Sequence, residues 1–283
     1  MPMTTSTRWL VALIVFGQNF APPLWEEIVE NQRAIVQGAD SASSAEMEAH
    51  AAACPQSDKP AAPASKPKSA PYDPTDQYEV RRIEGWRVLV NSAFLRQEPA
   101  LADDTFTLLR YQLYQITRKV PPVALAKLRR VTIWVELAEP HHPCMTYHPD
   151  RRWLSEHGMN PDKAKCVEVA NARNFLRWTL DQPWMVLHEL AHAYHDQFLG
   201  GFGNVEIRSA FERAMKAKRY EAVGHIHGRT ERAYAARNPM EYFAEATEAF
   251  FGTNDFFPFV RSELRQHDPE LYRLLERLWG VAN

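Results

Sequence analysis

The stretch from Trp184 to Gln197 reads WMVLHELAHAYHDQ and contains two histidines four residues apart, the first followed directly by a glutamate. Residues four apart lie on one face of a helix, so His188 and His192 can direct a ring nitrogen at the same metal ion. Zinc suits this pair, because it takes neutral imidazoles at about 2.0–2.1 Å together with a third protein ligand and a water. Glu189 reaches the same region from a different angle, where it is placed to accept a proton from a metal-activated water.

The residues around this pattern favour a buried helix. Asp181 is a candidate N-cap, Pro183 falls in the first turn, and Gly200 and Gly201 supply a stop. The apolar positions between them are Trp184, Met185, Leu187, Leu190 and Ala191. Burying a glutamate and two histidines among such residues is costly unless a metal or other partners compensate. The pattern also arises by chance in unrelated chains, but the helix signals and the apolar setting favour a metal site.

Residues 238–246 read NPMEYFAEA and offer a third ligand. The segment begins with asparagine as a candidate N-cap and proline at the first helical position. Glu241 and Glu245 are four apart and share a face that Glu248 extends, whereas the opposite stripe is largely apolar. Such a face is either solvated or directed at a positive charge, and the histidine pair still needs an oxygen ligand. We therefore predict Glu241 as the ligand and Glu245 as the acceptor that orients a histidine N–H.

Other candidates for the third ligand fit less well. A peptidase pattern with a third histidine six residues after the second is excluded, because the chain has Phe198 there and His195 where that pattern has glycine. Glu212 lies near the distance that another zinc-peptidase pattern requires, but the apolar spacing of its predicted helix puts it on the outer face. His225 and His227 remain alternatives to the glutamate, although a pair on a glycine-flanked loop is also typical of a cleft edge or a surface.

Three segments together resemble the catalytic domain of anthrax-lethal-factor-like zinc metallopeptidases: LHELAHA at 187–193, Tyr234, and EYFAEA at 241–246. This resemblance covers roughly the last third of the chain, and its spacing is more specific than the five-residue pattern alone. The chain departs from the family pattern at His195, where the family carries an acid, and its N-terminal half has no counterpart in that pattern.

The resemblance implies a zincin-like fold and zinc as the cofactor, with His188, His192 and Glu241 as the ligands. It also implies roles for two further residues. Glu189 would be the general base, and Tyr234, seven residues before the ligand glutamate, would assist the transition state.

The rest of the folded part is expected to be α+β, with a small mixed sheet packed on the active-site helix and a mostly helical C-terminal part. Alternating or apolar runs predict strands at 78–83, 86–90, 128–137 and 167–171, the last as an edge strand beside the cleft. Helical spacing predicts helices at 99–118, 205–220 and 269–278. The histidine- and proline-rich stretch 141–157 is expected to be an irregular loop, either over the metal site or on the surface.

Composition and the N-terminus suggest an exported protein. The chain has 283 residues and a formal net charge of −2, so no general nucleic-acid binding is expected. Arg8 precedes an apolar run at 9–16 that is long enough for an export signal but short for a membrane span. We therefore expect residues 1–21 to be a signal peptide or N-terminal anchor, and the protein to be secreted or extracytoplasmic, with membrane contact only through that segment.

The expected domain organisation continues with a largely disordered linker at 22–74, because residues 39–74 are rich in Ala, Ser, Pro and Lys. The metallopeptidase domain is expected at 75–283. Cys144 and Cys166 would be free to pair in an exported protein.

The sequence thus predicts a zinc-dependent metallopeptidase that acts on peptide or protein substrates. Two alternatives stay open at this point. One is a zinc-bound module that binds a partner without catalysis, and the other is a zinc hydrolase that acts on a non-peptide amide.

Overall fold

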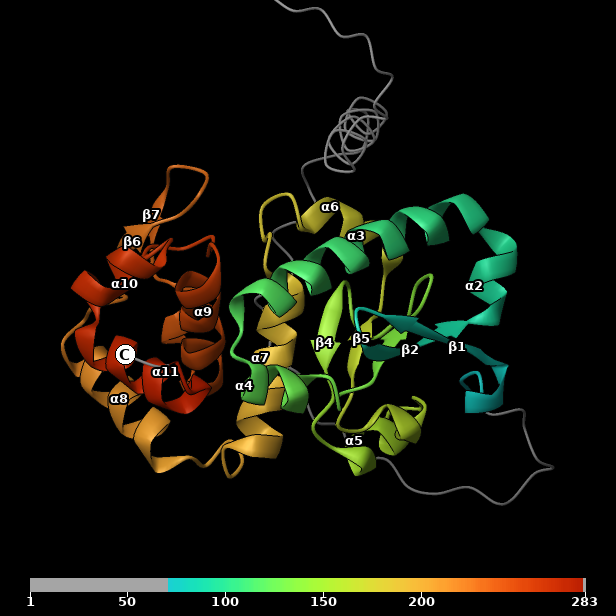
Figure 1. The fold of residues 1–283 in the computed structure, drawn as a ribbon, viewed down its shortest axis with the longest axis horizontal. Coiled ribbons are helices and arrows are strands. Elements are labelled where there is room, and N and C mark those ends of the chain that lie inside the picture. Colours follow the sequence, from blue (N-terminus) through green and yellow to red (C-terminus); the bar gives the residue numbers. More distant parts are fainter. Residues whose placement is uncertain (1–70, 282–283) are drawn as a thin grey trace, which may run out of the picture. The chain divides into compact units, whose positions relative to one another are not determined.

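The computed structural model describes residues 71–281. The predicted export signal and nearly all of the predicted linker lie outside the described residues. No helix in the described part is long and apolar enough to cross a membrane. The fold is α+β, as predicted: a five-stranded mixed sheet comes first and a mostly helical part follows it (Figure 1).

The sheet is built from five strands in the order β1-β2-β3-β5-β4. Its members are β1 Tyr78–Ile83, β2 Trp86–Asn91, β3 Ile133–Val135, β4 Met145–Tyr147 and β5 Val167–Val169. The predicted hairpin is confirmed: β1 and β2 pair antiparallel, and Glu84 and Gly85 both have positive φ, as a tight two-residue turn requires. Strands β2, β3 and β5 run parallel, and β4 pairs antiparallel with β5 at the edge.

Two strand predictions were wrong in position. The run 128–137 contributes only three strand residues, because Leu128 is the last residue of helix α4 (Pro122–Leu128). The segment at 167–171 is not an edge strand, since β5 lies between β3 and β4. The edge is β4, inside the stretch predicted to be irregular. A strand of three residues beside two prolines is too short to reveal itself by alternation.

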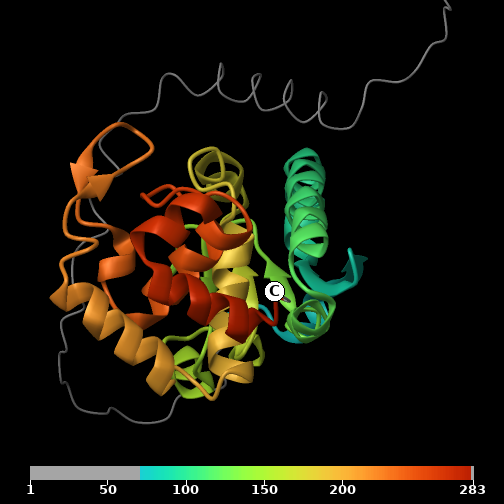
Figure 2. The same ribbon diagram turned by 60° about the vertical axis from the view of Figure 1, so that its left-hand side comes forward.

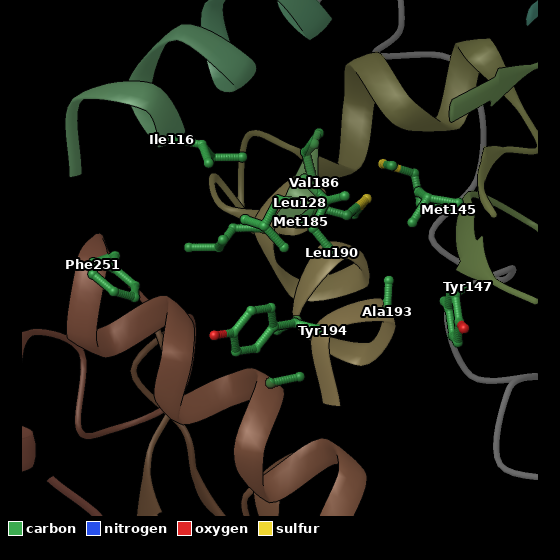
Figure 3. Close-up of a cluster of buried hydrophobic side chains, with 14 of the residues drawn as sticks. Ile116, Leu128, Met145, Tyr147, Met185, Val186, Leu190, Ala193, Tyr194 and Phe251 are labelled. Carbon is green, nitrogen blue, oxygen red and sulfur yellow. The ribbon is translucent and has the colours of Figure 1, made fainter. Parts of the chain in front are cut away.

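Helix α7 (Met185–Phe198) is the centre of the hydrophobic core. Strand residues Ile133, Val135, Val167 and Val169 are fully buried on the face of the sheet that packs against it. Figure 3 shows side chains of neighbouring elements around α7: Ile116 from α3 (Pro99–Lys119), Leu128 from α4, Met145 and Tyr147 from β4, and Phe251 from α9 (Pro239–Phe251). In Figures 1 and 2 this helix runs between the sheet and the C-terminal helices. Its position inside the molecule explains its apolar sequence.

The start of α7 differs from the prediction. Asp181 is not its N-cap, because the backbone N–H groups of Asp181 and Gln182 both donate to Trp178 O and so continue the end of α6 (Ala172–Trp178). The cap position belongs to Trp184, which offers no side-chain hydrogen bond. The predicted stop is confirmed, since Gly200 and Gly201 both have positive φ just after the helix.

The other face of the sheet carries a buried charge network. Lys163 Nζ lies 2.7 Å from Glu136 Oε1 and also contacts Glu168. Glu136 accepts a further hydrogen bond from the Tyr78 hydroxyl, and Glu168 one from His148. All five side chains are buried, so the single ammonium group compensates two carboxylates that water does not reach. His148 is therefore part of the fold and not of the metal site.

The remaining elements complete the domain. The N-terminal half adds η2 Thr75–Gln77, α2 Ser92–Gln97, α5 Arg151–Glu156 and η3 Pro161–Lys163. The C-terminal part adds α8 Val205–Lys216, the hairpin β6 Val223–Gly224 and β7 Thr230–Glu231, η4 Tyr234–Ala236, α9 Pro239–Phe251, α10 Arg261–His267 and α11 Pro269–Trp279. The predicted helices at 99–118 and 269–278 are confirmed, and the one at 205–220 ends four residues early. Cys144 and Cys166 are both free thiols.

Candidate metal centre

Helices α7 and α9 pack side by side and bring three predicted ligands together. His188 Nε2 lies 3.1 Å from Glu241 Oε2 and 3.1 Å from His192 Nε2, and His192 Nε2 lies 3.2 Å from the same glutamate oxygen. The predicted cap of α9 places the glutamate, since Asn238 Oδ1 accepts hydrogen bonds from the N–H groups of Met240 and Glu241. The three ligand atoms therefore form a nearly equilateral triangle.

This triangle has the dimensions of a tetrahedral metal site. Ligands at about 2.0–2.1 Å from one ion in a tetrahedral arrangement are separated from each other by about 3.3–3.4 Å, close to the separations seen here. The donor set is also the borderline nitrogen and oxygen set that zinc accepts. These three residues thus fit a zinc ion, and three protein ligands would leave a position open.

The contacts within the triangle shift the pKa values of His188 and Glu241 in opposite directions. Burial lowers the pKa of His188, but hydrogen bonds to Glu241 and Glu248 outweigh it and raise that pKa well above its ordinary value. Burial raises the pKa of Glu241, but the hydrogen bonds from His188 and His192 outweigh it and lower that pKa. Three groups that each offer a lone pair repel one another unless a proton or a metal ion lies between them.

Glu248, and not the predicted Glu245, makes the hydrogen bond that orients His188. His188 Nδ1 lies 2.7 Å from Glu248 Oε1 and 3.7 Å from Glu245 Oε1. A proton held on Nδ1 leaves Nε2 as the lone-pair atom, which is the atom that faces the triangle. The sequence signal was present, because Glu248 extends the carboxylate face, but helix spacing alone does not say which of two acids one turn apart reaches a ring.

Glu245 lies in a second layer of buried polar groups. Its Oε2 accepts a hydrogen bond from Asn254 Nδ2 at 3.2 Å, and Gln182 Nε2 donates to Asp255 Oδ2 at 3.3 Å. Burial, together with the charges of Asp255 and Glu248, raises the pKa of Glu245 well above its ordinary value. This carboxyl group therefore holds a proton more readily than an exposed glutamic acid does.

We call His188, His192 and Glu241 the metal group. Glu189 is a half-buried carboxylate that follows the first of these residues in the sequence. Among residues 71–281 it forms no hydrogen bond and no ion pair, in contrast to the acids of α9. Its charge acts on His188 and on Cys144, the residue that precedes β4. A carboxylate with no partner among the described residues, one residue from a candidate metal ligand, is available to exchange a proton with a bound molecule.

Tyr234 lies on η4, which packs against α9. Its ring is partly exposed, and its hydroxyl accepts a hydrogen bond from Arg237 Nη1 at 2.9 Å. Burial and the nearby charge of Glu241 raise its pKa, so the hydroxyl keeps its proton. Arg237 was not singled out in the sequence; its contact with the tyrosine depends on the turn between η4 and α9.

His192 lacks the kind of partner that His188 has. Its Nδ1 is buried without a hydrogen bond in the described part of the chain, and both ring nitrogens of His195 are in the same position. Burial lowers the pKa of His195 to about 4, so this histidine stays neutral between Phe202 and Phe243. His195 is therefore a core residue at the place where the sequence departs from the lethal-factor-like pattern.

The alternative third ligands lie elsewhere. Glu212 is exposed on α8, as predicted. His225 Nε2 lies 3.9 Å from Asp255 Oδ2, and His227 Nε2 lies 3.3 Å from Asp181 Oδ2. Neither histidine joins the group formed by His188, His192 and Glu241.

We expect Glu248→Leu to weaken metal binding by about 10–100-fold, because loss of such an outer partner frees the ligand ring to rotate. Glu248→Gln keeps an amide oxygen that can accept the Nδ1 proton and should lose less. Glu245→Gln is the matched control on the same helix face, one turn away. Competition with a chelator measures all three dissociation constants, and wild-type affinity in the leucine variant would contradict this role.

Residues 167–279 match the family model described as glucose-regulated metallo-peptidase M90. The matched segment begins with β5, contains the whole metal group and ends with α11. No curated protein and no solved structure matches the chain. On the match and on the histidine–histidine–glutamate group that lies inside it, the chain is a metallopeptidase, a hydrolase of peptide bonds, and its residues 167–279 are similar to the M90 family.

Proposed function

We propose that this metallopeptidase uses zinc, held by His188, His192 and Glu241, and that Glu189 is its general base. The single observation that carries the proposal is the triangle of ligand atoms, 3.1–3.2 Å on each side, next to a carboxylate that has no partner in the part of the chain that the structure describes. Zinc in such a site lowers the pKa of a water to about 7 and polarises a carbonyl oxygen.

The protein's own groups supply the remaining chemistry. Glu189 accepts the proton of the attacking water and then delivers it to the leaving amine. The Tyr234 hydroxyl keeps its own proton and donates a hydrogen bond to the carbonyl oxygen as negative charge develops there. Loss of one such donor typically costs about 10²–10³ in rate. The hydrogen bond from Arg237 supports this role, since a hydroxyl that accepts one bond is oriented to donate another.

Strand β4 is the element that we propose to hold the substrate backbone. It is the edge of the sheet, it packs against α7, and within the described residues its ladder partner is β5 alone. An extended peptide can add to such an edge through main-chain hydrogen bonds, with its side chains pointing alternately to opposite sides of the sheet. This assigns to β4 the role that the sequence suggested for residues 167–171.

We also retain the resemblance to lethal-factor-like peptidases as a proposal about the catalytic core. It is supported by the chain order of the histidine pair, Tyr234 and Glu241, and by the packing of η4 on α9. The M90 match covers the same segment.

The test is cleavage of an unbiased peptide library by the purified protein, with Glu189→Gln as the control. We expect wild-type cleavage to fall to background in the variant while bound metal is retained, because the amide cannot accept the proton. Undiminished cleavage in the variant would contradict Glu189 as the base. If wild type binds zinc and cleaves no peptide, the result would favour the binding module or a hydrolase of another amide.

A further inference from the structure

We propose that a cationic, aromatic-floored groove at the far end of α9 binds acidic segments of partner proteins. The groove has a volume of about 810 Å³ and lies between α10, α11 and the C-terminal ends of α3 and α9. Phe250 and Phe251 lie in it, nine and ten residues after Glu241, so it is about 13 Å along the helix from the metal group. None of its lining residues belongs to that group.

Positive charge and hydrogen-bond donors form the walls of the groove. Arg261 and Arg265 are four apart on α10 and share one face, and Lys119 ends α3 on the other side. Within residues 71–281 neither Arg265 nor Lys119 forms an ion pair or a side-chain hydrogen bond, and the lining contains no acidic residue. The charges of Lys119 and Arg265 are thus available to bind an acidic ligand.

The floor of the groove adds aromatic surface. Arg261 lies over the ring of Phe250 at 4.1 Å, and its Nε donates to the Tyr272 hydroxyl at 3.3 Å. A longer contact of 3.6 Å to Glu276 neutralises Arg261 only in part. An arginine over an aromatic ring gains a cation–π interaction and can still donate N–H groups to a carboxylate. The groove therefore suits acidic side chains, with the half-buried ring of Tyr272 as its exposed aromatic surface.

A peptide fits these features better than a phosphate compound does. Phosphates favour the free N–H groups at the start of a helix, but here Glu263 occupies that position. Its Oε2 accepts hydrogen bonds from the N–H groups of Phe259 and Val260, so a negative charge already lies at the start of α10. The donors that remain are side chains spread along the groove, which matches carboxylates spread along a peptide.

The test uses the full chain with Glu189→Gln, so that binding is read without cleavage and does not depend on the proposed mechanism. The probe is a short fluorescent peptide that alternates glutamate with phenylalanine; its counterpart carries glutamine in place of glutamate. We expect the acidic peptide to bind more tightly and its binding to weaken as salt is added. Equal binding of the two peptides, or no binding, would overturn the proposal.

Variants locate the binding on the surface. Lys119→Glu combined with Arg265→Glu should weaken the acidic peptide by at least about tenfold, because like charges then meet in the groove. The neutral pair Lys119→Gln and Arg265→Gln should give a smaller loss in the same direction. Arg110→Glu, an exposed charge reversal on the same helix as Lys119 but outside the groove, should change nothing. An equal loss of affinity for the acidic peptide in the Arg110 variant and in the groove variant would overturn the assignment. Displacement of the peptide by ATP, but not by a chloride solution of the same ionic strength, would overturn it as well.

Discussion

Replacing Glu241 with alanine is expected to abolish peptide cleavage through loss of the metal. The glutamate oxygen is the only oxygen in the triangle, and each of the two histidine Nε2 atoms lies within 3.2 Å of it. Two imidazoles from one helix would hold a zinc ion far more weakly than three ligands from two helices do. We expect a loss of more than about 100-fold in activity, beyond the range for an outer hydrogen-bond partner.

The matched control is Glu212→Ala, since Glu212 is the acid that a different zinc-peptidase spacing would select. It is exposed on α8 and pairs weakly with Arg208, so its loss should leave metal and cleavage unchanged. Circular dichroism of both variants separates loss of a ligand from loss of the fold. Normal cleavage in the Glu241 variant would show that another residue, such as His225, completes the site.

Lys163→Met is expected to give the largest loss of stability, about 3–5 kcal/mol. Lys163 is 3% exposed and Glu168 is fully buried, so the change leaves two carboxylates in the interior with no cation between them. Lys165→Met, two residues away, is the control. Lys165 is half exposed and pairs with Asp196 at the surface, where such a pair contributes about 0–1 kcal/mol. Urea unfolding measures both variants, and equal losses would contradict the role of the buried network.

The pH dependence of this loss has a definite sign. Burial raises the pKa of Glu168, but the hydrogen bond from His148 and the charge of Lys163 outweigh it, so the wild-type pKa is lowered. Its contribution to wild-type stability is therefore present above the unfolded-state pKa of about 4.3 and is lost as the pH falls below it. Without Lys163, only the hydrogen bond and the charge of His148 still oppose the effect of burial, so the pKa of Glu168 rises and the folded variant binds protons more readily than the folded wild type does. The difference between wild type and variant should thus be greatest near neutral pH and shrink toward pH 4.

The local features of the metal centre were predictable from sequence because each depends on residues no more than about one helical turn apart. His188 and His192 share a face through their spacing, and Asn238 followed by proline marks the start of α9. The pairing of the two helices was also accessible, since a histidine pair needs a third ligand and Glu241 stands on the only carboxylate face of a nearby apolar helix. The hairpin at Glu84 and Gly85 followed from turn chemistry in the same way.

Features that depend on tertiary packing were not predictable. Strand β4 exists because β5 and α7 hold it, and its three residues carry no period of their own. The choice of Glu248 over Glu245 depends on how far α9 is rotated against α7, which the spacing of the acids leaves open. Lys163 lies in a short 3-10 helix, and nothing local marks it as the partner of Glu136, which lies 27 residues earlier.

The most direct measurement on the central claim is the zinc content of three preparations of the full chain, purified and dialysed together: wild type, Glu189→Gln and Glu241→Ala. We expect equal zinc in wild type and in the Glu189 variant, because Glu189 is not a ligand of the metal. Cleavage should be seen in wild type alone, because the variant lacks the general base. The Glu241 variant should contain no zinc. Zinc in that variant at the wild-type level, or cleavage by chains free of metal, would contradict the assignment of His188, His192 and Glu241 as the metal centre of this peptidase.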